Sequence, residues 1–226
     1  MTLDPSRSPA GFLKFSGALA CVALFAFQLP FSPYANADPV NSMAAHAVRA
    51  RIAGIDVIAY PTEVKQVVTL RGSLPAGDVL SPRSNPAIAT LTGAMLDKGT
   101  QRQGKFAIAS RLEGVGAQLD FSVGEIMLTF SGKCLRKDLP LVISLLAEQL
   151  RMPAFSEEEF AKLKKQLSGS LQRNLERTDF RANEAFVRSI YPEGHPNHTP
   201  STAEFINAID AASLQQVRDF YSTWYG

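Results

Sequence analysis

The amino-acid sequence predicts an α+β fold, and three observations support this prediction. Segments with strand-like patterns lie in the first part of the chain, two further strand-like segments flank a Gly-Glu turn, and helix-periodic segments dominate the second half. With 226 residues, of which 46% are hydrophobic, the chain is long enough for one sizeable core. The formal net charge of +2 and the lack of a Lys/Arg run argue against a nucleic-acid partner.

The strand predictions rest on alternation and on turn residues. Residues 64–74 place Val and Leu on one side of a strand and mostly polar residues on the other, and a Pro-Ala-Gly-Asp turn follows. Gly54 separates two shorter strand-like pieces, and Gly124 with Glu125 separates another two. The predicted strands are 47–52, 55–60, 64–74, 117–123 and 126–130.

The helix predictions rest on helical spacing of apolar residues and on capping residues. Asn85 is expected to cap one helix, Asp138 another and Ser213 the last, while Ser156 and Glu159 have the spacing of a capping box. The predicted helices are 86–97, 106–113, 139–151, 156–177, 181–191, 203–209 and 214–225.

The N-terminus has the pattern of a secretory signal. Basic residues precede an apolar run at 15–29, and Ala35-Asn36-Ala37 follows as an A-x-A cleavage site. We therefore predict a signal peptide at residues 1–37, a linker at 38–45 and a mature chain that begins at Asp38 and keeps no stable membrane span. The alternative is a retained anchor helix, although the apolar run is shorter than the roughly 20 residues that a bilayer requires.

Four stretches together resemble one known family. They are TLTGAMLDKGT at 90–100, the segment 106–122, PAFSEEEFAKLKKQL at 153–167 and YPEGHP at 191–196. Their succession resembles the N-terminal domain of the M16 zinc peptidases, which include insulinase, pitrilysin and the mitochondrial processing peptidase. The resemblance spans residues 46–226 and implies a single M16 domain, with a mixed, mainly antiparallel sheet and helices packed on one face. It accounts for one half of the usual two-domain unit.

The resemblance also locates the chemistry that this chain lacks. Active M16 peptidases carry His-x-x-Glu-His on the helix before the Lys-Gly-Thr ending, with the histidines as zinc ligands and the glutamate as general base. Here Thr90, Gly93 and Ala94 fall at those positions, and Ser170 or Leu171 falls where the third ligand, a glutamate, is expected. None of these side chains offers an imidazole or a carboxylate. We expect no catalytic residue and no zinc in this chain.

Two histidines near the C-terminus could in principle bind a metal ion. His195 and His198 form a His-x-x-His pair that has the spacing of a possible metal pair. Pro196 lies between them, so they cannot share a helix face, and the pattern favours a surface loop.

For this family, the resemblance and the signal imply an exported, periplasmic or secreted, non-catalytic subunit or half-subunit. It would assemble with a catalytic M16 chain that carries the zinc, and together they would bind and process peptides. Two alternatives remain open: an active zinc metalloendopeptidase with unrecognised ligands, and a stand-alone peptide-binding or scaffold domain. The sequence assigns no substrate-binding residue.

Overall fold

The structure is a computed structural model that describes residues 43–192, 195 and 197–225. The predicted signal peptide, and the part of the predicted linker before Met43, lie outside these residues. The described chain divides into two compact units, one ending at Thr62 and the other beginning at Glu63.

The first unit is a β-hairpin preceded by one helical turn. The turn is α1 (Met43–His46), and strands β1 (Val48–Ile52) and β2 (Ile55–Ala59) pair antiparallel. Ala53 and Gly54 both have positive φ, 50° and 85°, as the tight reversal requires. Both predicted strands are therefore present, and they hinge where Gly54 indicated.

The second unit contains a three-stranded antiparallel sheet in the order β3-β5-β4. Its strands are β3 (Val67–Leu74), β4 (Gln118–Val123) and β5 (Leu128–Leu135). The register aligns the apolar residues of all three strands on one face, and it aligns mostly polar residues on the other. The apolar face comprises Val68, Leu70, Gly72, Leu74, Leu119, Phe121, Val123, Leu128, Phe130, Gly132 and Cys134.

Seven helices longer than one turn are described, and each matches a predicted helix to within three residues at either end. They are α2 (Ile88–Met95), α3 (Lys105–Glu113), α4 (Leu139–Arg151), α5 (Glu157–Leu175), α6 (Thr178–Ile190), α7 (Thr202–Ala211) and α8 (Leu214–Trp224). Short 3₁₀ turns at η2 (Asp78–Leu80) and η3 (Arg136–Asp138) precede α2 and α4. Within the described residues, no helix has both the length and the apolar character needed to cross a membrane.

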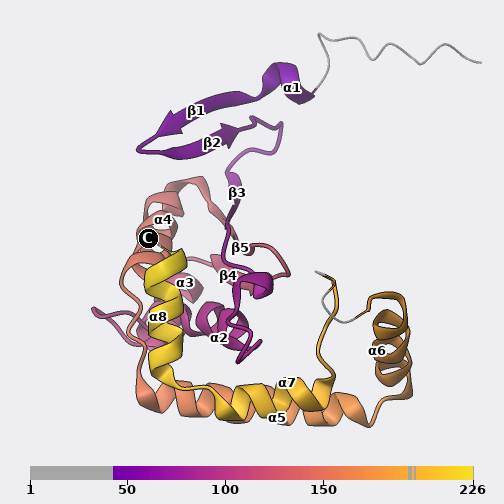
Figure 1. Cartoon of the computed structure of the whole chain (residues 1–226). Coiled ribbons are helices and arrows are strands. Elements are labelled where there is room, and N and C mark those ends of the chain that lie inside the picture. The colour runs from indigo at the N-terminus through magenta and orange to yellow at the C-terminus, as the bar shows by residue number, and fades with distance from the viewer. Residues whose placement is uncertain (1–42, 193–194, 196, 226) are drawn as a thin grey trace, which may run out of the picture. The chain divides into compact units, whose positions relative to one another are not determined.

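Helix α2 lies at the centre of the main core (Figure 1). Ile88 and Leu91 are completely buried, and Met95 is nearly so. Around them pack Leu128 of β5, Phe160 and Leu163 of α5, and Val217 and Phe220 of α8. The helices therefore cover the apolar face of the sheet, as the predicted fold requires.

A second, smaller cluster forms near the start of α4. Cys134 of β5 lies there with Ala117 and Val142, and all three are buried. Burial raises the pKa of the Cys134 thiol, so this residue behaves as a small apolar side chain.

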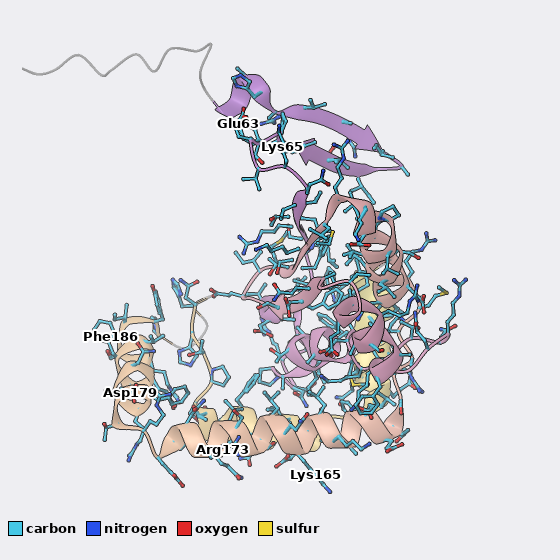
Figure 2. The ribbon with its side chains drawn as sticks, turned by 180° about the vertical axis from the view of Figure 1, so that it is seen from behind. Glu63, Lys65, Lys165, Arg173, Asp179 and Phe186 are labelled. Carbon is cyan, nitrogen blue, oxygen red and sulfur yellow. The ribbon has the colours of Figure 1, made fainter. Side chains whose placement is uncertain are left out.

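Helix α7 lies along α5 (Figure 1), and polar contacts fix the pair. The Lys164 ammonium donates to the carbonyl oxygens of Asp210 and Ala212, at 2.7 and 2.8 Å, at the C-terminal end of α7. Ser168 donates to the Asp210 carboxylate at 3.0 Å. Lys165 and Arg173, by contrast, point away from this contact (Figure 2).

Three of the predicted caps differ from expectation. The N-cap position of α2 is Ala87 and not Asn85, although the Asn85 side chain accepts from the Ala87 amide at 3.0 Å. Asp138 occupies the N-cap position of α4, but its side chain makes no capping hydrogen bond. At α5 the Ser156 hydroxyl accepts from the Glu159 amide, whereas the Glu159 carboxylate turns to Lys105 and Lys162 and leaves the capping box half formed. The expected cap at Ser213 forms a complete box with Gln216.

A buried carboxylate anchors the loop between α2 and α3. Glu148 of α4 is 7% exposed, accepts from the Thr100 hydroxyl, and accepts from the Gln103 amide at 3.1 and 3.2 Å. The Thr100 hydrogen bond, more than any other contact, lowers the pKa of Glu148 against the opposing effect of burial. The ionised form of Glu148 therefore stabilises the fold.

This arrangement predicts a pH-dependent loss of stability in Glu148→Gln. The wild-type carboxylate contributes above its ordinary pKa near 4.5, and this contribution disappears as the pH falls through the lower folded value. We expect the variant to lose about 2 kcal/mol of unfolding free energy at pH 7, with a smaller difference at pH 3. Urea unfolding at both pH values measures this, with the exposed Glu113→Gln as control. An equal difference at both pH values would contradict the assignment.

Candidate functional site

Helix α2 carries the three positions at which the resemblance predicted missing zinc chemistry. The Thr90 hydroxyl donates to Asp78 Oδ1 at 2.8 Å, so it is already engaged. Gly93 is buried against the sheet. Ala94 is partly buried and packs at the margin of the main core. All three positions of α2 therefore contact neighbouring parts of the second unit.

Of these three residues, Gly93 lies closest to the sheet. A Cβ atom at this position would lie 2.3 Å from Cγ2 of Val123 and 3.0 Å from Cδ1 of Leu128. The valine methyl sits on a stiff, β-branched side chain that has little freedom to move aside. A glutamate at position 93 would bring the same Cβ into this contact, so the present packing has no room for the general base of an M16 peptidase.

The predicted third-ligand position lies on α5. Ser170 is exposed there, whereas Leu171 is partly buried, packs on the main core and lines a cavity. A leucine offers a metal ion no donor atom.

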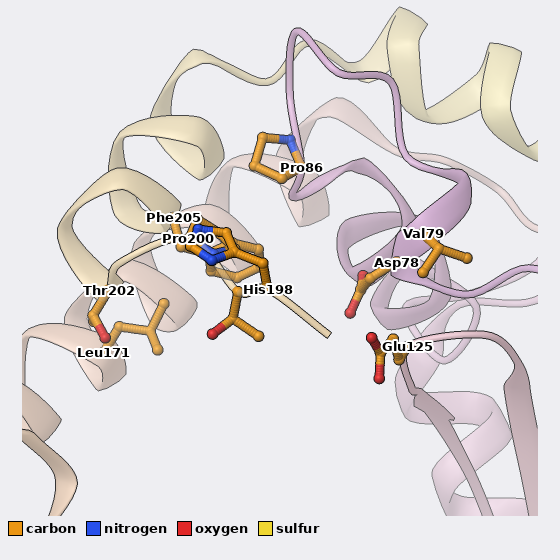
Figure 3. Close-up of a pocket in the computed structure, with 10 residues that line it drawn as sticks. Asp78, Val79, Pro86, Glu125, Leu171, His198, Pro200, Thr202 and Phe205 are labelled. Atoms are coloured by element: carbon orange, nitrogen blue, oxygen red, sulfur yellow. The ribbon is translucent and has the colours of Figure 1, made fainter. Parts of the chain in front are cut away.

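The cavity has a volume of about 430 Å³ and lies within the second unit (Figure 3). It falls in the size range of sites that hold small ligands or side chains. Figure 3 shows the carboxylates of Asp78 and Glu125 beside each other on one side and His198 on the other. Its lining residues are Asp78, Val79, Pro86, Glu125, Leu171, His198, Thr199, Pro200, Thr202 and Phe205.

Backbone hydrogen bonds bring the two carboxylates together although 46 residues separate them. The segment 77–79 pairs with the turn of the β4–β5 hairpin through three bonds. The amides of Gly77, Asp78 and Val79 donate to the carbonyls of Ile126, Gly124 and Glu125, at 3.2, 3.0 and 2.9 Å. A Cβ on Gly77 would lie 2.3 Å from the Ile126 carbonyl carbon, so only glycine permits this approach.

The side of the cavity that carries the two carboxylates is negatively charged, with Asp78 half-buried and Glu125 exposed. Burial is the main cause that raises the pKa of Asp78, the Thr90 hydrogen bond opposes it, and the charge of Glu125 adds to it. Among the residues that the structure describes, neither carboxylate forms an ion pair with a lysine or an arginine.

His198 is fixed on the opposite side of the cavity. Its Nδ1 lies 2.8 Å from the Tyr191 carbonyl oxygen, which can only accept, so Nδ1 carries the proton of this hydrogen bond. His195, in contrast, stacks on the Tyr191 ring with centroids 4.8 Å apart. The two histidines thus have separate environments, and the interpretation of this pair as a loop missed that His198 lines a cavity.

Asp78 and Glu125 were also missed as site residues. The sequence predicts only that each lies in a turn. No motif links the two residues, and their proximity results from pairing between distant segments. A turn ending in Gly-Asp before the degenerate helix was the one available signal.

Zinc does not fit the residues present at the family's positions. None of the side chains at Thr90, Gly93, Ala94, Ser170 or Leu171 supplies an imidazole, carboxylate or thiolate. Across the described portion of the chain, no group of three or more His, Cys, Asp or Glu side chains is arranged to hold a metal ion.

The Gly93 contact predicts opposite effects for two helical glycines. We expect Gly93→Ala to lose about 1–3 kcal/mol of unfolding free energy, because the added methyl overpacks the helix–sheet contact. We expect Gly169→Ala, whose Cβ would meet only Arg173 at 3.6 Å, to gain about 0.5–1 kcal/mol. Urea unfolding measures both.

A double variant tests the cause. Val123→Ala removes the obstructing methyl, so the pair Gly93→Ala/Val123→Ala should be at least 0.5 kcal/mol more stable than the sum of the single effects predicts. Simple additivity would show that the Val123 contact is not responsible.

Three solved structures share this fold, each with a TM-score well above 0.5. The peptidase M16 inactive domain from Pseudomonas fluorescens is 22% identical with a TM-score of 0.68, and the match covers 78% of this chain and 43% of that one. The periplasmic protease PqqL from Escherichia coli is 16% identical with a TM-score of 0.70, over 80% of this chain and 21% of that one. Pitrilysin is 16% identical with a TM-score of 0.66, over 80% and 20%.

These structural likenesses show the fold alone, and the chain spans less than half the length of each of the three proteins. No curated protein matches the chain. A family model described as insulinase (peptidase family M16) matches residues 57–193, which is more than half of the chain. This protein therefore belongs to the M16 peptidase family.

Proposed function

We propose that this chain is a non-catalytic M16 peptidase-like subunit or half-subunit. It is exported and assembles with a catalytic, zinc-bearing M16 chain to bind and process peptides. The observation that carries the proposal is the packing of α2, where Gly93 meets Val123 and leaves no space for a general base.

The chemistry of the helix supports binding without hydrolysis. Peptide hydrolysis by a zinc peptidase needs a metal-bound water and a carboxylate that takes its proton. The hydroxyl of Thr90 is engaged with Asp78, and Gly93 and Ala94 have no polar side chain. The cavity beside this helix is nevertheless large enough to receive a peptide side chain. Zinc chemistry would then belong to the partner chain.

The relatives favour a partner or a further domain. The chain spans 43% of the Pseudomonas fluorescens protein, whose structure is described as an inactive M16 domain, and about a fifth of PqqL and pitrilysin. An M16-like domain at residues 46–226 corresponds to one part of such a longer chain. Inactive M16 domains therefore occur on this fold, and we infer that this one serves a catalytic chain.

The proposal predicts that the purified chain holds little zinc and cleaves no peptide. After dialysis against trace zinc, metal analysis should give far less than one zinc per chain, and a fluorogenic peptide library should remain intact. Co-expression with a His-x-x-Glu-His M16 chain from the same genome should yield a stable complex by size-exclusion chromatography. That complex should cleave peptides.

Three contrary results separate the alternatives. Stoichiometric, tightly held zinc together with peptidase activity would establish a metalloendopeptidase with unrecognised ligands. Peptide binding without any complex would establish a stand-alone binding domain. If the chain neither binds peptides nor forms a complex, the proposal is wrong altogether.

Export makes a separate prediction about the mature N-terminus. With residues 1–37 as signal peptide, N-terminal sequencing of the protein from a periplasmic or secreted fraction should read Asp38 first. Replacing Ala37 with a bulky residue should block cleavage, because signal peptidase sites require small side chains. A full-length chain recovered from the membrane fraction would instead indicate a retained anchor.

A further inference from the structure

We infer that the cavity beside α2 binds an arginine side chain of a peptide, with the guanidinium between Asp78 and Glu125. This inference rests on the proposed function and specifies the peptides that the subunit would accept.

The first support is the shape and lining of the cavity. One side carries the two carboxylates, and the other walls include the apolar side chains of Pro86, Leu171 and Phe205. An arginine combines a methylene stem that packs on apolar surface with a charged end that seeks carboxylates. The methylene stem of an arginine therefore matches the apolar side chains of the cavity, and its guanidinium matches the two carboxylates.

The second support is the uncompensated charge. Asp78 is partly buried, Glu125 lies beside it, and neither pairs with a basic side chain in the described residues. A half-buried carboxylate without a cation is unfavourable, so an entering cation would offset the desolvation of Asp78 and its repulsion from the exposed Glu125.

The third support is that the main chain carrying both carboxylates, and the Asp78 carboxylate itself, are held before a ligand arrives. Backbone hydrogen bonds from residues 77–79 to the hairpin turn hold the main chain of both residues. The Thr90 hydroxyl donates to Oδ1 of Asp78 and orients that carboxylate, whose two oxygens can accept further hydrogen bonds from a ligand. Pre-positioned acceptors lower the entropic cost of binding.

Arginine suits this site better than lysine. Its planar guanidinium has five N–H donors in a fork, so it can address two neighbouring carboxylates at once, whereas the lysine ammonium is a compact point charge. We therefore expect the order arginine, then lysine, then uncharged side chains.

Isothermal titration calorimetry on the full chain tests the inference with acetyl-Ala-Leu-Arg-Leu-Ala-amide. The blocked ends leave arginine as the only charge. Matched peptides carry lysine, glutamine or norleucine at the central position. We expect the arginine peptide to bind at least tenfold more tightly than the glutamine and norleucine peptides, with lysine between them.

Variants of the chain locate the site. Asp78→Asn and Glu125→Gln should each weaken binding of the arginine peptide at least fivefold, and both remove charge with little change of shape. Glu113→Gln, an exposed carboxylate on α3 outside the cavity, should leave binding within twofold of wild type. Far-UV circular dichroism and urea unfolding establish that each variant is folded. Glu125→Lys, on the hairpin turn, should abolish arginine binding even if Asp78→Asn proves unstable.

The outcomes distinguish this inference from the function on which it rests. Equal binding of the arginine and norleucine peptides, or arginine binding that survives both charge-removing variants and Glu125→Lys, would overturn the inference and leave peptide binding intact. Failure of all four peptides to bind would overturn both.

Discussion

The contact between Gly93 and Val123 sets the position of helix α2 on the sheet, and the rest of the second unit depends on that position. In a closely packed protein interior, even one added methyl group displaces the surrounding side chains. With no side chain at position 93, the helix can approach strand β4 until a Cβ would be only 2.3 Å from a valine methyl. The same approach buries Ile88 and Leu91 completely.

This close approach has a chemical counterpart. A catalytic M16 helix must accommodate a glutamate and two histidines around a metal ion, and it therefore needs space where this chain has a closely packed contact. The positions at which the resemblance places zinc ligands and the close contact with Val123 thus lie on the same turns of α2. A lineage that no longer has to keep this space open can fill it with stabilising contacts, since active sites commonly cost stability.

Much of the fold could be predicted from local patterns, because apolar spacing reflects burial directly. The helices at residues 139–151 and 214–225 followed from spacing and caps, and the alternation over residues 64–74 assigned the faces of β3 correctly. Strand β5 extends to Leu135, beyond the predicted end at Phe130, because β3 pairs along its whole length and supports Ser131 and Gly132 despite their weak strand propensity.

The site was harder to predict, because its residues are brought together by tertiary contacts. The degenerate positions on α2 followed from the resemblance, but Asp78 and Glu125 belong to two separate turns. Their proximity depends on three main-chain hydrogen bonds and on a glycine at position 77, which carry no signature in a single sequence. Half of the Ser156 capping box failed for a similar reason, since Lys105, distant in sequence, attracts the Glu159 carboxylate.

Main-chain hydrogen bonds hold together the two segments that carry Asp78 and Glu125, and this has an evolutionary consequence. The side chains at positions 78 and 125 supply none of the hydrogen bonds that pair the two segments, since amides and carbonyls make those bonds. Substitution at position 125 can therefore change the charge of this side of the cavity while the scaffold keeps its shape, and substitution at position 78 can do so where the new side chain still accepts from Thr90. Such an architecture separates the choice of ligand from the maintenance of the fold, so that related chains can diversify their recognition by single mutations.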